Sequence, residues 1–292
     1  MQKGILLAGG SGSRLHPMTL AASKQLLPVY DKPMIYYPLS VLMLAGIRDI
    51  LIVSTPADLP QFRRLLGDGE RLGVTFTYVV QPSPDGLAQA FLLDRDWLGD
   101  SPCALALGDN LIFADHLSVS LRAAVNRPSG ASVFAYQVRD PERYGVVTMA
   151  DDGRALEIVE KPAAPLSNWA VIGLYFYDHR VGELAARVQP SPRGELEITD
   201  LNKMYLAEGS LHVERLGRGC AWLDAGTPDS LLQAATFVQT IQSRQGMLVG
   251  CPEEVAFRMG WIDAARLRGH ARALGKTELG RVLAELAEGE HA

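Results

Sequence analysis

The sequence predicts an α/β protein with an open, mixed, mainly parallel sheet flanked by helices and a helical C-terminal segment. Three observations favour this fold. Short uninterrupted apolar runs at residues 4–8, 49–54 and 103–107 are typical of strands buried on both faces of a parallel sheet. Helical patterns at residues 33–45, 59–66 and 87–93 alternate with strand patterns. A glycine-rich loop follows the first apolar run directly.

The first half of the chain repeats a strand–loop–helix unit. The helix predicted at residues 33–45 ends at Gly46, because glycine commonly stops a helix. Residues 74–80 form a further strand, since their pattern alternates and several of them are β-branched. The run at residues 103–107 ends at Gly108-Asp109-Asn110. Strands of such sheets carry ligand sites at their carboxyl ends, so we expect a binding site there.

From residue 131 onward, strand patterns follow one another with few helices between them. Strands are predicted at residues 131–138, 145–149, 156–160, 170–177, 211–216 and 221–224. Asp151-Asp152-Gly153 is a hairpin-type turn, and a helix is expected over residues 195–206, after Gly194. Because no linker-like or low-complexity stretch divides the two halves, we expect the second half to extend the sheet of the first.

The C-terminal part is predicted to be helical. Thr227 is the expected N-cap and Pro228 the first residue of a helix, one face of which is lined by Leu231, Ala235, Val238 and Ile241. Residues 252–288 read as helical throughout. A narrow apolar stripe there consists of Leu279, Val282, Leu283 and Leu286. The stripe suits either packing against its own chain or a subunit interface.

Composition is that of an ordinary globular protein, with 48% hydrophobic and 21% charged residues. The net charge of −5 argues against a broad nucleic-acid footprint. No apolar stretch approaches the length of a membrane span or of a signal peptide, so a cytoplasmic protein without membrane contact is expected. Cys103, Cys220 and Cys251 lack metal-ligand spacing and are expected to be reduced thiols.

The glycine-rich loop is a candidate anion site. It reads Gly9-Gly10-Ser11-Gly12-Ser13, with Arg14 next and Lys24 ten residues later. Glycine lets backbone N–H groups approach an anion, and the two cations can neutralise its charge. A Walker loop needs a lysine after its second glycine, which is missing here, and the dinucleotide fingerprint fails because Leu15 occupies its third glycine position.

Longer motifs resemble those of sugar-nucleotidyltransferases. The first are LAGGSGSRL at residues 7–15 and KQLLP at residues 24–28. Four more narrow the resemblance to the thymidylyltransferases that act on glucose 1-phosphate: DKPMIYYPL at residues 31–39, QPSPDGLAQA at residues 81–90, PERYGVV at residues 141–147 and GELEITD at residues 194–200. The resemblance runs from Lys3 to about Ile262.

The resemblance implies a Rossmann-like nucleotidyltransferase fold and a reaction between dTTP and α-D-glucose 1-phosphate. The products would be dTDP-glucose and pyrophosphate, in the first step toward dTDP-sugars such as dTDP-rhamnose. Mg²⁺ and a homo-oligomer, a tetramer in the family, are implied as well. A phosphate monoester has a second pKa of about 6, so in-line attack at the α-phosphorus needs no general base. Catalysis should therefore rest on positioning and charge neutralisation.

The resemblance also divides the chain. The core would comprise residues 1–228, with a nucleotide-binding part at about 1–115 and a sugar-phosphate-binding part at about 116–228. Residues 229–292 would form an oligomer-forming or regulatory segment. The tail after Ile262 departs most from the family, so the resemblance leaves feedback control through a second nucleotide site open.

Site residues are implied in four groups. Arg14 and Lys24 would be catalytic cations, while Asp109 and Asp224, each at the end of an apolar strand, would bind the metal. The nucleotide-binding residues would be Leu7, Gly9, Gly10, Ser11, Gly12, Ser13, Gln25, Gln81, Pro84 and Gly86, with Gln81 and Gly86 reading the base. The sugar-phosphate-binding residues would be Asn110, Tyr144, Gly145, Glu160, Lys161 and Val171.

Simpler interpretations stand beside these roles. Arg14 and Lys24 could be solvated surface residues, and Asp224 could be a turn residue before the helix at Thr227. Residues 81–86 could be an ordinary loop, and Glu160-Lys161 a solvated turn. The run NLIFAD at residues 110–115 departs from the family's NIFYGH beside the sugar pocket, which leaves fine sugar selectivity open.

Two other functions fit the same sequence. One is a uridylyltransferase that prefers UTP, because the methyl group that separates thymine from uracil contributes only about 1–3 kcal/mol in an apolar pocket. The other is a non-catalytic sensor of nucleotide sugars. A sensor could lose any of Arg14, Lys24, Asp109 and Asp224, yet all four are present.

Overall fold

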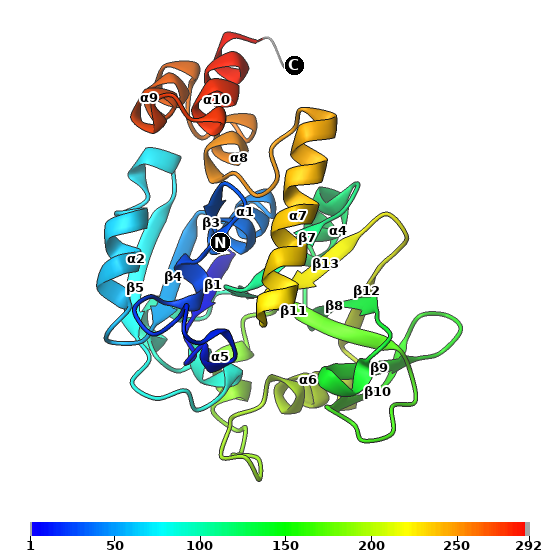
Figure 1. Ribbon diagram of the computed structural model, residues 1–292. Coiled ribbons are helices and arrows are strands. Elements are labelled where there is room, and N and C mark those ends of the chain that lie inside the picture. The colour runs from blue at the N-terminus through cyan, green and yellow to red at the C-terminus, as the bar shows by residue number, and fades with distance from the viewer. Residues whose placement is uncertain (1, 290–292) are drawn as a thin grey trace.

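A computed structural model describes residues 2–289, so residue 1 of the expected core and residues 290–292 of the expected C-terminal segment lie outside it. Its centre is a nine-stranded mixed sheet (Figure 1). Along the main path the strands are β10 (Ala155–Glu160), β9 (Gly145–Met149), β11 (Trp169–Tyr177), β6 (Cys103–Leu107), β1 (Lys3–Ala8), β4 (Asp49–Ser54) and β5 (Thr75–Val80). Off this path, β8 (Ala131–Gln137) pairs with β11 and with β12 (Leu211–Leu216). The predicted fold class is confirmed.

The sheet joins the two halves of the chain. Strands β6, β1, β4 and β5 are parallel neighbours, and the apolar residues of β1 are buried, as expected of a strand covered on both faces. Strand β11 runs antiparallel to β6, with Tyr175 opposite Leu105, and connects the second half directly to the first. The expectation of one continuous sheet is confirmed.

Two small sheets had not been predicted. Strand β7 (Asn110–Phe113) pairs with β13 (Ala221–Asp224), and β2 (Pro28–Val29) pairs with β3 (Lys32–Pro33). The pairing of β7 with β13 joins segments far apart in sequence, so the local pattern of residues 110–113 carries little sign of it. It sets Asp224 opposite Asn110 and therefore beside Asp109.

The helices cover both faces of the sheet (Figure 1). They are α1 (Tyr36–Leu44), α2 (Leu59–Leu66), α3 (Arg95–Leu98), α4 (Leu117–Val125), α5 (Val181–Ala185) and α6 (Ile198–Ala207). Short 3-10 turns are η1 (Ser13–Leu15), η2 (Lys24–Leu26), η3 (Glu70–Leu72), η4 (Leu87–Phe91) and η5 (Pro141–Arg143).

Three helices differ from their predictions. Helix α1 begins after Pro33, because Lys32 and Pro33 belong to the hairpin β2–β3. The segment expected as a helix over residues 87–93 is the 3-10 turn η4. Helix α6 begins at Ile198 rather than at residue 195, because the backbone of Leu196 is bonded to the loop before η4. Tertiary hydrogen bonds therefore set these boundaries.

The C-terminal part contains α7 (Pro228–Gln245), α8 (Pro252–Arg258), α9 (Ala264–Leu274) and α10 (Glu278–Glu288). The Thr227 side chain caps α7 by accepting a hydrogen bond from the Ser230 backbone N–H, as the sequence predicted for Thr227. The prediction of a helix throughout residues 252–288 is wrong, because the chain turns at Gly260 and Gly275, both at positive φ.

The apolar stripe of the last helix packs on its own chain. Leu279, Leu283 and Leu286 of α10 are buried in the same core cluster as Leu267 and Ala271 of α9. Of the two interpretations of the stripe, self-packing is the one that the structure describes. Within residues 2–289, no helix combines the length and the apolar character that a membrane crossing requires.

Candidate functional site

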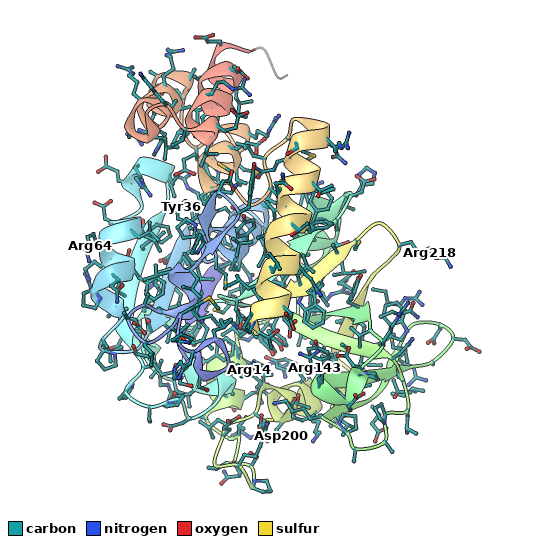
Figure 2. All side chains as sticks on the ribbon, in the orientation of Figure 1. Arg14, Tyr36, Arg64, Arg143, Asp200 and Arg218 are labelled. Carbon is teal, nitrogen blue, oxygen red and sulfur yellow. The ribbon has the colours of Figure 1, made fainter. Side chains whose placement is uncertain are left out.

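Cations and carboxylates meet where β1, β6 and β13 end. Lys24, in η2, is buried, and its Nζ lies 2.5 Å from Asp109 Oδ2. A Cβ atom built on Gly226 would lie 3.4 Å from a terminal nitrogen of Arg14 and 3.6 Å from Lys24 Nζ. Since Gly226 follows Asp224 by two residues, the predicted cations and both predicted metal ligands gather at one place. Figure 2 shows Arg14 near the start of α7, with Arg143 beside it in the view.

Arg14 differs from Lys24 in its surroundings. Its side chain is exposed, and within residues 2–289 it has no ion-pair partner. Lys24, in contrast, is held by Asp109, whose other oxygen accepts a hydrogen bond from Asn110 Nδ2 at 2.8 Å. The site therefore contains one fixed cation and one that extends into open space.

Asp224 occupies an electrostatically costly position. Burial raises the pKa of its carboxyl group above the usual range, and nearby Asp109 raises it further, whereas Arg143 lowers it. The Tyr144 hydroxyl donates to Asp224 Oδ2 at 3.3 Å, and an Arg143 nitrogen lies 3.5 Å from the same oxygen. Burial and Asp224 together raise the pKa of Tyr144 to about 12.

The two carboxylates fit a hard divalent cation. Oxygen ligands suit Mg²⁺, and a cation between Asp109 and Asp224 would offset the mutual repulsion that raises the pKa of Asp224. Within residues 2–289, no three His, Cys, Asp or Glu side chains group to hold a metal ion. An ion here would therefore take its remaining ligands from phosphate oxygens and water.

The glycine loop is held open by its neighbours. Gly10 and Gly12 have φ of +101° and +59°, which favours glycine at both positions. Thr19 Oγ1 donates to the Gly12 carbonyl at 2.8 Å, and Gln25 Nε2 donates to the Gly9 carbonyl at 3.1 Å. The hydroxyl groups of Ser11 and Ser13 are exposed and 3.4 Å apart, whereas Leu7 is buried in β1. The Gln25 amide thus holds the backbone of the glycine loop at Gly9.

The predicted base-reading residues lie beside this loop. Gln81 follows β5 and is only 6% exposed, and its Oε1 lies 2.6 Å from the position a Cβ on Gly9 would take. Gly86 has φ of +107°, and a Cβ there would lie 2.4 Å from both the N and the O of Leu196. The close approach at Gly86 is therefore made by the chain's own backbone. Pro84 is exposed on the same loop.

The predicted sugar-phosphate residues gather around the pairing of β9 with β10. Gly145 lies opposite Glu160, whose Oε2 accepts from Thr199 Oγ1 at 2.6 Å. Lys161 is exposed, and its Nζ lies 3.7 Å from Glu160 Oε1. Val171, on β11, is buried, and its Cβ lies 4.0 Å from the position that a Cβ on Gly145 would take.

Asn110 has a structural task in this arrangement. Its Oδ1 accepts from the Gly173 N–H at 3.1 Å and from Trp222 Nε1 at 2.6 Å, and its Nδ2 donates to Asp109. Both ends of the buried amide are thus bonded within the protein. Asn110 connects β7, β11 and β13 and orients the Asp109 carboxylate.

Two arginines at the site were missed from the sequence. Arg143 touches Asp224, and Arg193 places one nitrogen 3.5 Å from Glu160, 3.6 Å from Glu195 and 2.7 Å from Glu197. Arg143 stands inside the motif at residues 141–147 and could have been found there. Arg193 lies just before the motif at residues 194–200 and pairs with the nearby Glu195 and Glu197, whereas its contact with Glu160 depends on segments distant in sequence.

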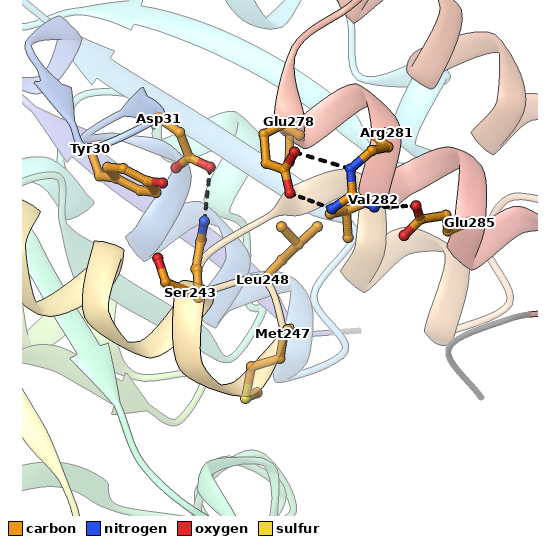
Figure 3. A pocket seen from close by; sticks show the side chains of 12 residues that line it. Tyr30, Asp31, Ser243, Met247, Leu248, Glu278, Arg281, Val282 and Glu285 are labelled. Atoms are coloured by element: carbon orange, nitrogen blue, oxygen red, sulfur yellow. Dashed lines mark hydrogen bonds and ion pairs between the residues drawn. The ribbon is translucent and has the colours of Figure 1, made fainter.

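A separate hollow lies at the far end of α7 (Figure 3). It encloses about 170 Å³, and its walls include Tyr30, Asp31, Gln242 and Arg281. With a rise of about 1.5 Å per residue, α7 places this hollow roughly 27 Å from the helix start. None of the predicted site residues lines it.

The chain has extensive likeness to known proteins. The nucleotidyl transferase family model matches residues 3–241. The glucose-1-phosphate thymidylyltransferase of Xanthomonas campestris pv. campestris (strain B100) is 60% identical over 287 residues, covering 98% of this chain and 97% of the relative. The enzyme of that name from Mycobacterium tuberculosis (strain ATCC 25618 / H37Rv) is 56% identical over 286 residues, covering 98% and 99%.

Solved structures agree with these relatives. A crystal structure assigned as a glucose-1-phosphate thymidylyltransferase from Bacillus anthracis, in complex with a sucrose, superposes with a TM-score of 0.75 at 41% identity, covering 81% of this chain and 95% of that one. UDP-glucose pyrophosphorylase complexed with UDP-glucose superposes with a TM-score of 0.70 at 24% identity, covering 82% and 99%, which bears on the fold alone. The chain belongs to the nucleotidyl transferase family, and within it to the glucose-1-phosphate thymidylyltransferases.

Proposed function

We propose that the chain transfers a thymidylyl group from dTTP to α-D-glucose 1-phosphate, giving dTDP-glucose and pyrophosphate. The observation that carries the proposal is that Arg14, Lys24, Asp109 and Asp224 lie together at the strand ends. The chain is also 60% identical to a relative that is named a glucose-1-phosphate thymidylyltransferase. The reaction brings a phosphate dianion toward a triphosphate, so charge is its main barrier. Two cationic side chains and a carboxylate pair that can bind a metal ion would lower this barrier by neutralising negative charge.

On the nucleotide side, the glycine loop and Arg14 would hold the β- and γ-phosphates that depart as pyrophosphate. The Arg14 guanidinium is exposed and has no ion-pair partner among residues 2–289, which suits a group that binds a polyanion. Lys24 would stabilise the charge that develops around the α-phosphate. Because Asp109 already fixes Lys24, its ammonium group needs little reorganisation during the reaction.

Asp109 and Asp224 would hold Mg²⁺, which when bound supplies positive charge at the phosphate oxygens. Asn110 keeps one oxygen of Asp109 in place, and Tyr144 and Arg143 do the same for Asp224. These contacts orient both carboxylates before a substrate arrives.

On the sugar side, Tyr144, Gly145, Glu160, Lys161 and Val171 would bind glucose 1-phosphate. Glu160 can accept hydrogen bonds from sugar hydroxyls while Thr199 holds its other oxygen. Lys161 extends its ammonium group from an exposed position and can meet the sugar phosphate. The attacking phosphate is already ionised, so the site needs no general base.

The finer parts of the proposal concern the molecule in its cell. We place it in the cytoplasm, on a route to dTDP-sugars such as dTDP-rhamnose, as a homotetramer. Residues 1–228 would form the catalytic core, with the nucleotide-binding part at about 1–115 and the sugar-phosphate-binding part at about 116–228. Residues 229–292 would form the oligomer-forming or regulatory segment. Size-exclusion chromatography with light scattering tests the tetramer directly.

The test of the proposed function is a product assay. With Mg²⁺, dTTP and glucose 1-phosphate, dTDP-glucose and pyrophosphate should appear in equal amounts, and EDTA should stop both. Release of no pyrophosphate by a folded protein would favour the nucleotide-sugar sensor instead.

A further inference from the structure

We infer that Asp85 and Gln89 fix the orientation of the Gln81 amide and thereby decide which nucleobase edge the site accepts. Both are positioning residues in this inference, which rests on the proposed binding of a nucleotide beside Gln81. The side chains of Gln81, Gln89 and Asp85 are joined in a chain of hydrogen bonds. The Asp85 carboxylate determines which group donates and which accepts in each of these bonds.

The fixed end is the Asp85 carboxylate. Its Oδ2 accepts from Gln89 Nε2 at 2.8 Å and from Ser83 Oγ at 2.6 Å. A carboxylate only accepts hydrogen bonds, so Gln89 must turn its amide nitrogen toward Asp85. The carbonyl oxygen of Gln89 then points the other way, toward Gln81.

The orientation passes on to Gln81. Its Nε2 donates to Gln89 Oε1 at 2.7 Å, so its own carbonyl oxygen faces Gly9. Among residues 2–289, none donates a hydrogen bond to Gln81 Oε1. Gln81 as a whole is only 6% exposed, and its amide oxygen is an acceptor next to the glycine loop.

Such an acceptor distinguishes base edges. Thymine and uracil carry an N3–H donor that Gln81 Oε1 can bind, whereas N3 of cytosine is itself an acceptor. Reversing the Gln81 amide to suit cytosine would place its oxygen against Gln89 Oε1. Gln89 cannot reverse in turn, because its oxygen would then face the Asp85 carboxylate. The Asp85 carboxylate therefore makes the binding of cytosine unfavourable without contacting the base itself.

The test measures dissociation constants for dUTP, dCTP and dTTP by isothermal titration calorimetry. The first two differ only at the base edge, so their ratio reports the Gln81 orientation. The ratio of the dissociation constants of dTTP and dUTP measures the contribution of the thymine methyl group and should be the same in all variants. Gln89→Met and Asp85→Asn should each lower the preference for dUTP over dCTP by about tenfold or more. Gln137→Met, at an exposed position on β8, is the matched control and should leave it unchanged.

A double variant separates orientation from general damage. Gln89→Glu alone places two carboxylates together, and their repulsion should move the side chain at position 89 away from Gln81 Nε2 and so weaken the preference for dUTP. In the double variant Gln89→Glu with Asp85→Asn, the amide introduced at position 85 can donate to the carboxylate introduced at position 89. That carboxylate can then accept from Gln81 Nε2 again, so the preference for dUTP over dCTP should return. An unchanged dUTP to dCTP ratio in Gln89→Met and Asp85→Asn, or the lack of any preference in the unmodified protein, would overturn the inference. Discrimination by a protein that forms no product would instead overturn the proposed reaction and leave the inference standing.

Discussion

At the residue scale, the central pair is Lys24 with Asp109. A buried ammonium group requires a partner, and Asp109 supplies it at 2.5 Å. The pair therefore holds a positive charge in place at the strand ends, beside the Arg14 guanidinium. This explains how Lys24, ten positions after Arg14, can act together with the glycine loop.

We expect Lys24→Ala to lower kcat by about 100-fold or more, the effect typical of removing one preorganised electrostatic group. The reason is that the α-phosphate region loses its fixed cation. Steady-state pyrophosphate release measures the change, with Lys276→Ala, at an exposed position between α9 and α10, as the control. Near-normal turnover by the Lys24 variant would remove this residue from the mechanism.

Asp224 combines a proposed role in function with a cost in stability. Its pKa is raised in the folded protein, so folding favours the protonated carboxyl group and stability falls as pH rises through that pKa. Asp224→Asn keeps an acceptor for Tyr144 but removes the buried charge. We expect lost turnover together with an equal or higher Tm at neutral pH.

Thermal unfolding at pH 5 and pH 8 checks the sign of this effect. The raised pKa of Asp224 predicts that the gain in Tm of Asp224→Asn over the unmodified protein grows with pH, because ionisation of the buried carboxyl group destabilises the unmodified protein. Full activity, or a clear loss of Tm at pH 8, would contradict the assignment.

Site residues with a strand-end position could be predicted, and those defined by long-range contacts could not. Asp109 and Asp224 each stand at the end of an apolar strand, which marks them as candidates, and the pairing of β13 with β7 brings them together. Asn110 was expected at the sugar phosphate, yet its amide is bonded to Gly173 and Trp222. These partners lie more than sixty residues away in sequence, and no local pattern announces them.

At the element scale, the loop between β5 and η4 depends on Gly86. Its φ of +107° and the Leu196 backbone at 2.4 Å leave no room for a side chain. Leu196 also bonds to Asp85 and Ala88, so this contact links the nucleotide loop to the segment that leads into α6. These backbone hydrogen bonds join the proposed nucleotide subsite to the proposed sugar-phosphate subsite.

Gly86→Ala should destabilise the protein by about 1–3 kcal/mol, the usual range for backbone strain, and raise KM for dTTP. Urea unfolding and initial rates measure the two effects. Gly209→Ala is the matched control, because Gly209 has φ of +69° but nothing within 4 Å of its added Cβ. If both variants lose the same stability and neither changes KM, the contact with Leu196 is not what constrains this loop.

The buried parallel strands could be predicted more closely than the starts of α1 and α6, for a physical reason. A buried strand needs only a short apolar run, as in β4 and β6, where the observed bounds equal the expected ones. The starts of α1 and α6 are decided by a hairpin and by the bonds of Leu196, which lie outside the local pattern. The breaks at Gly260 and Gly275, in contrast, have a local signal, because glycine commonly ends a helix.

At the scale of the whole molecule, one sheet unites two halves with different tasks. Strand β11 pairs with β6 on one side and with β8 and β9 on the other. The carboxyl ends of the parallel strands and the β9–β10 region thereby border the same site. In the proposed reaction the nucleotide would lie at the parallel strand ends and the sugar phosphate at the β9–β10 region.

The C-terminal helices contribute to the core as well. Leu283, in α10, is fully buried against the chain's own residues. Leu283→Ala should therefore lower the free energy of unfolding by about 2–5 kcal/mol. Chemical denaturation measures this, with Leu166→Ala, at a position that is 79% exposed, as the control. A loss that appears only as dissociation of an oligomer would show that the stripe is an interface after all.

The most direct test of the account is a matrix of initial rates with Mg²⁺, in which nucleoside triphosphates are paired with hexose 1-phosphates. We predict the highest kcat/KM for dTTP with glucose 1-phosphate. UTP should be lower by a factor of about 10–100, because its base lacks the thymine methyl group and its ribose carries an additional 2′-hydroxyl group. UTP used as well as dTTP, or no pyrophosphate from any pair, would contradict the proposed thymidylyl transfer.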